Sequence, residues 1–226
     1  QLQQIVLANG LDVDVLNFGI SGMRIENQFR NLNSVQNLGP DDIVVFYDGV
    51  NDLNKIYELG LSLKNNRTPW RQINKLLSEL ENRSWFIRYL APTVYVESRG
   101  IGQDFLGSQA DQLVADNWSA FDKLARSYVE SKGAKFVHIL QPNLLTYTKA
   151  SEIGKVRQKW SDMKAIENNL VNYATETNKI IDFTKILDEL NVTPFFDWAH
   201  LDESGNKKVA EEMFKIVEPL LGAKKK

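Results

Sequence analysis

Short apolar, β-branched runs alternate along this chain with longer stretches of helical periodicity. The apolar runs are each closed by a glycine, proline or polar turn and are typical of buried strands: residues 13–16, 43–47, 135–142 and 179–183. The helical patterns each carry one apolar face: residues 110–131, 156–178 and 206–220. This alternation predicts an α/β fold, a three-layer α/β/α sandwich around a parallel sheet.

The chain has the size and composition of one domain. It has 226 residues, of which 43% are hydrophobic, and it contains no cysteine. We therefore expect a single domain over residues 1–226, without disulfides or thiolate catalysis. A net charge of −2 gives no electrostatic reason to expect nucleic acid as a partner. No signal peptide or long apolar span is recognisable, and the compartment, membrane association and oligomeric state of the parent protein stay open.

An extended insertion is expected at about residues 55–107, because this interval is longer than a strand-to-helix connection requires. It is rich in aromatic residues and arginine, and Thr68-Pro69 is typical of a helix start. The apolar stripe after this start consists of Trp70, Ile73, Leu77 and Leu80. The stripe either packs on the sheet or forms a wall or lid beside a crevice; mixed charges disfavour a membrane-surface helix.

The first candidate for chemistry is the pair Asp197 and His200, three residues apart just before the last helix. Imidazole changes charge near neutral pH, and a carboxylate one turn away can orient it and stabilise its cation. The pair predicts acid/base catalysis, with acyl transfer as the first reaction to test. A solvated cluster at a helix start is the alternative interpretation.

Two polar turns follow the first two predicted strands and carry hydrogen-bond donors. Gly22 lies in the turn after residues 13–16, and Asn51 lies in the turn after residues 43–47. The carboxyl ends of parallel strands share one edge of a sheet, where ligands bind, so both turns are expected near His200. The backbone N–H of Gly22 and the side-chain amide of Asn51 together predict an oxyanion hole.

These segments resemble the second, third and fifth sequence blocks of the SGNH (GDSL-type) hydrolases, in the family's order. The resemblance covers nearly the whole chain and rests on the Gly22 turn, the Asn51 turn and the pair Asp197 and His200. It implies a flavodoxin-like sheet, oxyanion donors at Gly22 and Asn51, a general base at His200 and an orienting carboxylate at Asp197. It implies no cofactor and no metal, and a small-molecule, carbohydrate or lipid ester as the substrate.

The chain departs from the family at the first block, the turn that carries the nucleophilic serine. Residues 1–9 contain no serine, and their apolar spacing predicts an uncapped helix that ends at Gly10. We therefore expect that the first strand of the sheet is missing from residues 1–226 and belongs between the strands at 13–16 and 43–47. Residues outside this numbering, or another chain, would supply it with the serine.

Serines within the chain are weaker candidates for the nucleophile. Ser21 and Ser204 are expected near the site but not on a sharp strand-to-helix turn, and Ser204 is more simply a helix N-cap. Ser108 follows no strand. His138 lies within an apolar strand and is interpreted as a core histidine with one hydrogen bond rather than a catalytic residue.

Two functions from different classes follow from these patterns. The leading one is an esterase or acyl hydrolase of SGNH type, whose serine lies upstream of residue 1. The alternative is a binding or accessory module on the same fold that has lost its nucleophile. A metal site is disfavoured because its candidate ligands lie on separate turns without a recognisable metal loop: Asp48, Asp52, Asp197, His200 and Asp202.

Overall fold

The structure is a computed structural model that describes residues 1–54, 110–148, 163–177, 179–191 and 193–221. The chain divides into two compact units, one formed by residues 1–52 and 115–226 and the other by residues 53–114. The second unit lies almost entirely outside the described residues, and so do the predicted insertion, its helix after Thr68, and Ser108. The site predicted from the sequence belongs to the first unit.

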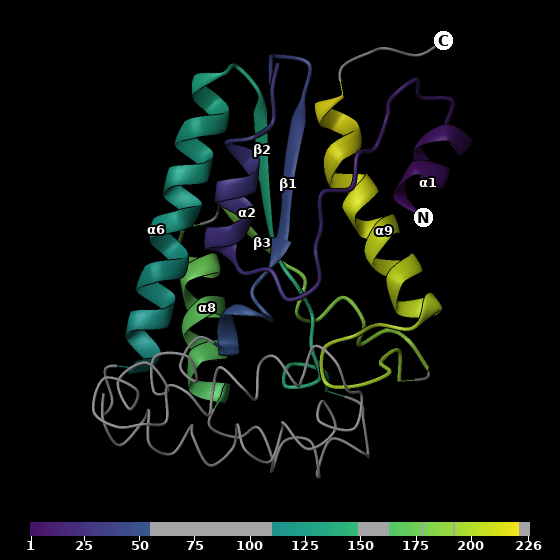
Figure 1. The fold of residues 1–226 in the computed structure, drawn as a ribbon. Helices are drawn as coiled ribbons and strands as arrows, with labels where there is room; N and C mark the ends of the chain where they lie inside the picture. The colour runs from purple at the N-terminus through teal and green to yellow at the C-terminus, as the bar shows by residue number, and fades with distance from the viewer. Residues whose placement is uncertain (55–109, 149–162, 178, 192, 222–226) are drawn as a thin grey trace, which may run out of the picture. The chain divides into compact units, whose positions relative to one another are not determined.

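Three parallel strands form the sheet of this unit, in the order β1-β2-β3 (Figure 1). They are β1 (Ile43–Asp48), β2 (Lys135–Leu140) and β3 (Ile180–Asp182), each within one residue of a predicted apolar run or inside it. Ile43 of β1 lies opposite Lys135 of β2, and His138 of β2 lies opposite Ile180 of β3. The predicted parallel sheet is therefore confirmed for the last three predicted strands.

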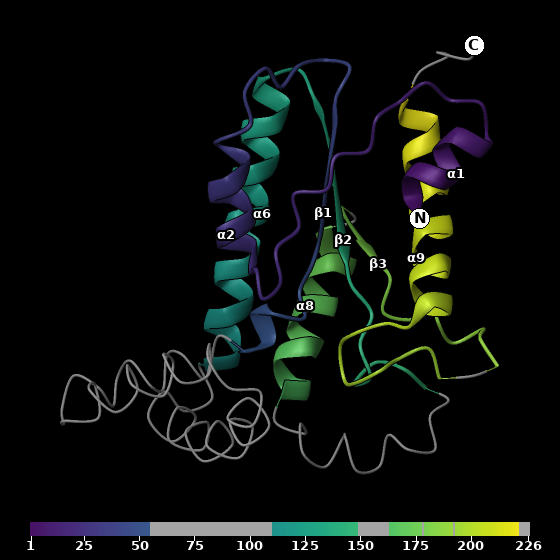
Figure 2. The same cartoon turned by 45° about the vertical axis from the view of Figure 1, so that its right-hand side comes forward.

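Helices cover both faces of the sheet, which gives the predicted three layers (Figure 2). One face carries α2 (Ile25–Leu32), α6 (Ala110–Ser131) and α8 (Met163–Thr177), and the other carries α1 (Leu2–Ala8) and α9 (Glu203–Val217). Short 3-10 turns follow β1 and α9: η1 (Asp52–Asn54) and η3 (Glu218–Leu220). None of the helices in the described part of the chain is long and apolar enough to cross a membrane.

Most helix ends agree with the sequence patterns, and α1 lacks a side-chain cap as expected. Helix α9 begins at Glu203 and not at residue 206, because the Asp202 carboxylate accepts a hydrogen bond from Gly205 N at 2.8 Å and caps the helix. The predicted helix at 156–178 is described only from Met163. Helix α2 was not predicted, because its polar sequence starts at Arg24 without a strong N-cap residue.

The strand predicted at residues 13–16 is not formed. The segment runs extended beside β1 in both views (Figures 1 and 2), but its backbone is bonded by a side chain: Gln3 Nε2 donates to Val13 O at 3.0 Å, and Gln3 Oε1 accepts from Val15 N. An apolar run becomes a strand only when another backbone pairs with it. Among the described residues, β1 pairs with β2 alone. The segment 13–16 therefore has no neighbouring strand with which to pair.

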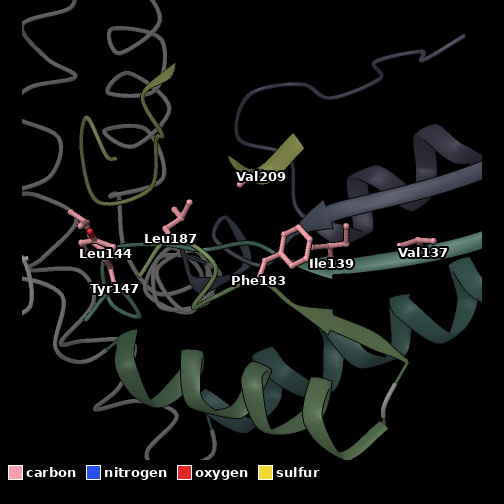
Figure 3. Close-up of a cluster of buried hydrophobic side chains, with 7 residues drawn as sticks. All are labelled: Val137, Ile139, Leu144, Tyr147, Phe183, Leu187 and Val209. Atoms are coloured by element: carbon pink, nitrogen blue, oxygen red, sulfur yellow. The ribbon is translucent and has the colours of Figure 1, made fainter. Parts of the chain in front are cut away.

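Apolar side chains between the sheet and α9 form one core cluster (Figure 3). Its fully buried members include Ile139 of β2 and Leu187, and Val209 contributes from α9. A second cluster joins α1 to α9 through Val6 and Phe214, with Val13 of the extended segment packed against it. The apolar face of α9 predicted from the sequence is thus the face that meets the sheet and α1.

A buried polar network lies on the opposite face of the sheet, around His138 of β2. Its Nδ1 lies 2.9 Å from Asp122 Oδ1, and its Nε2 lies 3.0 Å from Asp48 Oδ1. Arg126 Nη2 donates to Asp122 at 3.1 Å, and Trp118 Nε1 donates to Asp48 at 2.8 Å. His138 is a core residue as predicted, but the prediction of a single hydrogen bond was wrong, because both ring nitrogens are bonded.

The network makes the imidazole of His138 a cation at neutral pH. Burial by itself would lower the pKa of His138, but the charge of Asp48 and hydrogen bonds to Asp122 and Asp48 outweigh it and raise the pKa to about 9. Burial raises the pKa of Asp122, but the hydrogen bond and charge of His138 and the charge of Arg126 outweigh it and lower that pKa overall. The charges in the core therefore compensate each other.

We predict that the free energy of unfolding falls as pH rises from 6.5 to about 9. The folded-state pKa of His138 lies above its unfolded value, so its stabilisation is complete below pH 6.5 and is lost as pH rises through about 9. The shift corresponds to about 3 kcal/mol. Urea unfolding at several pH values measures this loss. The slope of the unfolding free energy against pH should be smaller in Asp122→Asn. An equal slope in wild type and in His138→Gln would contradict the assignment.

We also predict that Gly49→Ala destabilises the protein more than Gly10→Ala does. Both glycines have positive φ, but a Cβ at Gly49 would lie 2.4 Å from Leu140 Cδ1, whereas a Cβ at Gly10 would meet no atom within 4 Å. Gly10→Ala should cost about 1 kcal/mol from backbone strain alone. Gly49→Ala should cost about 3 kcal/mol, since overpacking is added. Equal shifts in the denaturation midpoint would show that the turn after β1 is not tightly packed.

Candidate active site

A closed loop before α9 positions Asp197 and His200. Phe195 and Leu201 form an antiparallel bridge, and Phe196 N donates to His200 O at 2.8 Å. Asp202 N donates to Pro194 O at 2.9 Å, which fixes the end of the loop against the start of the helix. The loop geometry therefore follows from local backbone pairing together with the helix cap at Asp202.

Asp197 is bonded to His200 through side chain and backbone. Asp197 Oδ2 lies 2.7 Å from His200 Nδ1, while its Oδ1 accepts hydrogen bonds from Ala199 N and His200 N, each at 2.8 Å. Burial raises the pKa of Asp197, but these backbone and side-chain hydrogen bonds outweigh it and lower the pKa overall. The His200 side chain is 73% exposed, so solvent and ligands can reach the imidazole while its Nδ1 is held by the carboxylate.

The Gly22 turn and the Asn51 turn are joined to each other. Asn51 Nδ2 donates to Met23 O at 2.9 Å, and Ile25 N donates to Asp52 Oδ1 at 3.4 Å. Gly22 has a φ of +78° and open space where a Cβ would be. Among the described residues, none accepts a hydrogen bond from the Gly22 amide. One amide hydrogen of Asn51 and the N–H of Gly22 are thus the groups available to an anionic oxygen.

The segment that follows β2 connects this pair of turns to the His200 loop. Gln141 N donates to Asp48 O, and Leu144 N donates to Trp198 O, each at 2.9 Å. Both regions lie at the carboxyl end of the strands (Figures 1 and 2). In the described part of the chain, no hydrogen bond joins Gly22 or Asn51 to Asp197 or His200. The turns of Gly22 and Asn51 therefore form one bonded group, and the loop of Asp197 and His200 forms another. The segment after β2 bonds to both groups.

Sequence reasoning missed the residues of this supporting segment. Asn143 Oδ1 accepts from Leu145 N at 2.9 Å, and Asn143 Nδ2 donates to the buried Glu167 at 3.0 Å. This side chain shapes the turn whose next residue, Leu144, bonds the His200 loop. The available signal was Pro142-Asn143 at the end of the predicted run 135–142, a pattern typical of turns.

Two of the serines considered as nucleophiles, Ser204 and Ser21, lie in the described part of the chain. Ser204 Oγ donates to Asp202 Oδ1 at 2.7 Å, and Asp202 rather than Ser204 is the N-cap of α9, so the prediction of Ser204 as the cap was wrong. Ser21 is exposed in the turn before Gly22. In the part of the chain that the structure describes, no group of three or more His, Asp or Glu side chains could hold a metal ion.

Comparison with known proteins identifies the family of this chain. A family model described as GDSL-like lipase/acylhydrolase matches residues 2–213, which is most of the chain. No curated protein and no solved structure matches it significantly. The family match agrees with the parallel α/β fold. The chain therefore belongs to the GDSL-like lipase/acylhydrolase family, a family of hydrolases that act on esters.

Proposed function

We propose that the protein is a serine esterase or acyl hydrolase in which His200 is the general base. The observation that carries the proposal is the bond between Asp197 Oδ2 and His200 Nδ1 at 2.7 Å, with the imidazole exposed. A carboxylate on one ring nitrogen leaves the other nitrogen to take a proton from a nucleophile and to return it to the leaving group. The same fold could instead carry a binding or accessory module, which turnover measurements distinguish.

The proposed reaction has two steps. The serine oxygen attacks the ester carbonyl while His200 takes the serine proton, and the C–O bond to the alcohol breaks as the imidazolium returns that proton to the leaving alcohol. Water then attacks the acyl-enzyme, again giving its proton to His200, and the carboxylic acid leaves as the serine is reprotonated. The Gly22 N–H and the Asn51 amide stabilise the oxyanion formed in each step.

The nucleophilic serine is proposed to come with a further strand upstream of residue 1, which pairs with the edge of β1 that β2 does not occupy. Three observations support this placement. Residues 13–16 are extended but pair with no described strand, and Leu16 in this segment and Phe18 and Ile20 after it are exposed. A hollow of about 440 Å³ lies between α1, α9 and Asn17, which follows the extended segment, and is lined in part by Leu2, Asn17 and Val209. A strand there would cover apolar surface and place its carboxyl end at the site.

The substrate class proposed from the family is an ester of a small molecule, a carbohydrate or a lipid. Because His200 is exposed, the described residues around it do not restrict the size of the acyl group. No cofactor is needed for this chemistry. A panel of nitrophenyl esters, acetylated sugars and glycerides would rank the three classes by kcat/KM.

We predict that Asn51→Ala lowers kcat by 100-fold to 1000-fold, the range for loss of one oxyanion donor. The matched control is Asn33→Ala, because Asn33 is exposed and its Nδ2 also donates to a backbone carbonyl, that of Phe29, at 3.0 Å. The control should keep its turnover. Ester hydrolysis under saturating substrate, together with thermal denaturation of both variants, measures the difference. Equal turnover in wild type and Asn51→Ala would remove Asn51 from the mechanism.

We predict that His200→Ala nearly abolishes ester hydrolysis with little change in stability, because the side chain is exposed. Asp197→Asn should cost less, since it keeps the base and removes only orientation and charge stabilisation. Full activity in His200→Ala, or no ester turnover in the full-length wild type, would reject the proposal; the latter favours the binding module.

A further inference from the structure

The turn that carries Asn51 is anchored at its start by a side chain from the core. Asp48 is the last residue of β1 and is buried, and Gly49 directly after it has a φ of +109°. Asp52 N donates to Gly49 O at 3.1 Å, which closes the turn around Asn51. The position of Asp48 therefore sets where the turn begins, and only two residues separate Asp48 from Asn51.

Asp48 receives two hydrogen bonds on one carboxylate oxygen. His138 Nε2 lies 3.0 Å from Asp48 Oδ1, and Trp118 Nε1 donates to the same oxygen at 2.8 Å. The other ring nitrogen of His138 lies 2.9 Å from Asp122 Oδ1. A neutral imidazole has one N–H and donates to one acceptor, so the doubly protonated ring is the form that donates to both carboxylates.

Among the described residues, the charged and titratable groups around His138 come from β1, α6 and α8. Strand β1 contributes Asp48, helix α6 contributes Asp122 and Arg126, and the residue opposite on β3 is the uncharged Ile180. Helix α8 contributes Tyr173, whose ring lies 6.0 Å from that of Trp118; burial and the charge of Asp122 raise its pKa, so it is neutral where His138 titrates. Two cations thus face two carboxylates in the core.

Loss of the cation would leave Asp48 without a compensating charge in a buried position. A buried carboxylate without its partner moves toward water or takes up a proton. Either change would alter the end of β1, while the bond from Asn51 Nδ2 to Met23 O holds the far side of the turn. The turn is tightly packed, since Gly49 lies against Leu140 without room for a Cβ.

We infer that His138 is a positioning residue for catalysis: through Asp48 it holds the turn that carries Asn51 in the geometry of an oxyanion donor. This inference rests on the proposed function only in the role of Asn51. The physical coupling between the imidazolium and the Asn51 turn stands without it. Displacement of a catalytic donor by a fraction of an ångström lowers turnover with little effect on ground-state binding.

The test compares His138→Gln with Lys215→Gln in the full-length protein. Lys215 is an exposed cation paired with Glu212 at 2.7 Å, so its variant removes a charge of the same sign outside the core. His138→Gln should lower kcat by about tenfold to a hundredfold per folded molecule, with KM changed less than about threefold. Lys215→Gln should keep both constants. A folded His138→Gln protein with wild-type kcat would overturn the inference.

A second measurement needs neither a variant nor catalysis. In ¹⁵N-labelled wild-type protein, the Asn51 side-chain amide resonance should move with pH with the same midpoint as the His138 ring resonances. An Asn51 resonance that stays fixed while His138 titrates would overturn the inference, even where His138→Gln fails to fold. If the coupling is present but the wild type hydrolyses no ester, the esterase proposal fails and the coupling of His138 to the turn survives.

Discussion

The parallel register of β1 and β2 determines the position of every group at the candidate site. It places Asp48 opposite Leu140, so the Asn51 turn and the segment after β2 leave the sheet side by side. The first turn then bonds Met23 next to Gly22, and the second bonds the loop of His200 through Leu144. A slip of one residue would separate these bonds and turn the buried side of each strand to the other face.

The two histidines of the chain illustrate how surroundings decide chemistry. His138 is fully buried and both of its ring nitrogens are bonded to carboxylates. His200 has one carboxylate partner and an exposed ring, which suits proton transfer. We expect the buried imidazolium of His138 to stabilise the fold and the exposed imidazole of His200 to transfer protons during the reaction.

The strands of the sheet were predictable because buried apolar runs between turns have few other uses in an α/β chain. Residues 13–16 have such a run, yet they form no strand, because sequence does not report whether a neighbouring backbone is present. Helix α2 escaped prediction because its start at Arg24 lacks a strong cap. The His138 network was also invisible, since Asp48 lies 90 residues away and only the fold brings the two together.

The candidate site was partly readable because Asp197 and His200 are local in sequence, three residues apart. The proposal of Gly22 and Asn51 as oxyanion donors required the further assumption that strand ends meet at one edge of a sheet. The support provided by Asn143 and Leu144 could not be read, because it consists of backbone bonds between distant loops. Local pairs are therefore predictable from sequence, and the contacts that position them are not.

The most direct test of the account is covalent labelling of the full-length protein with a fluorophosphonate, followed by mass spectrometry of its peptides. The account predicts one modified serine, located upstream of Gln1, with labelling that is lost in His200→Ala because the base no longer activates the nucleophile. Modification of Ser21 or Ser204, or ester turnover by a protein that the probe does not label, would contradict it.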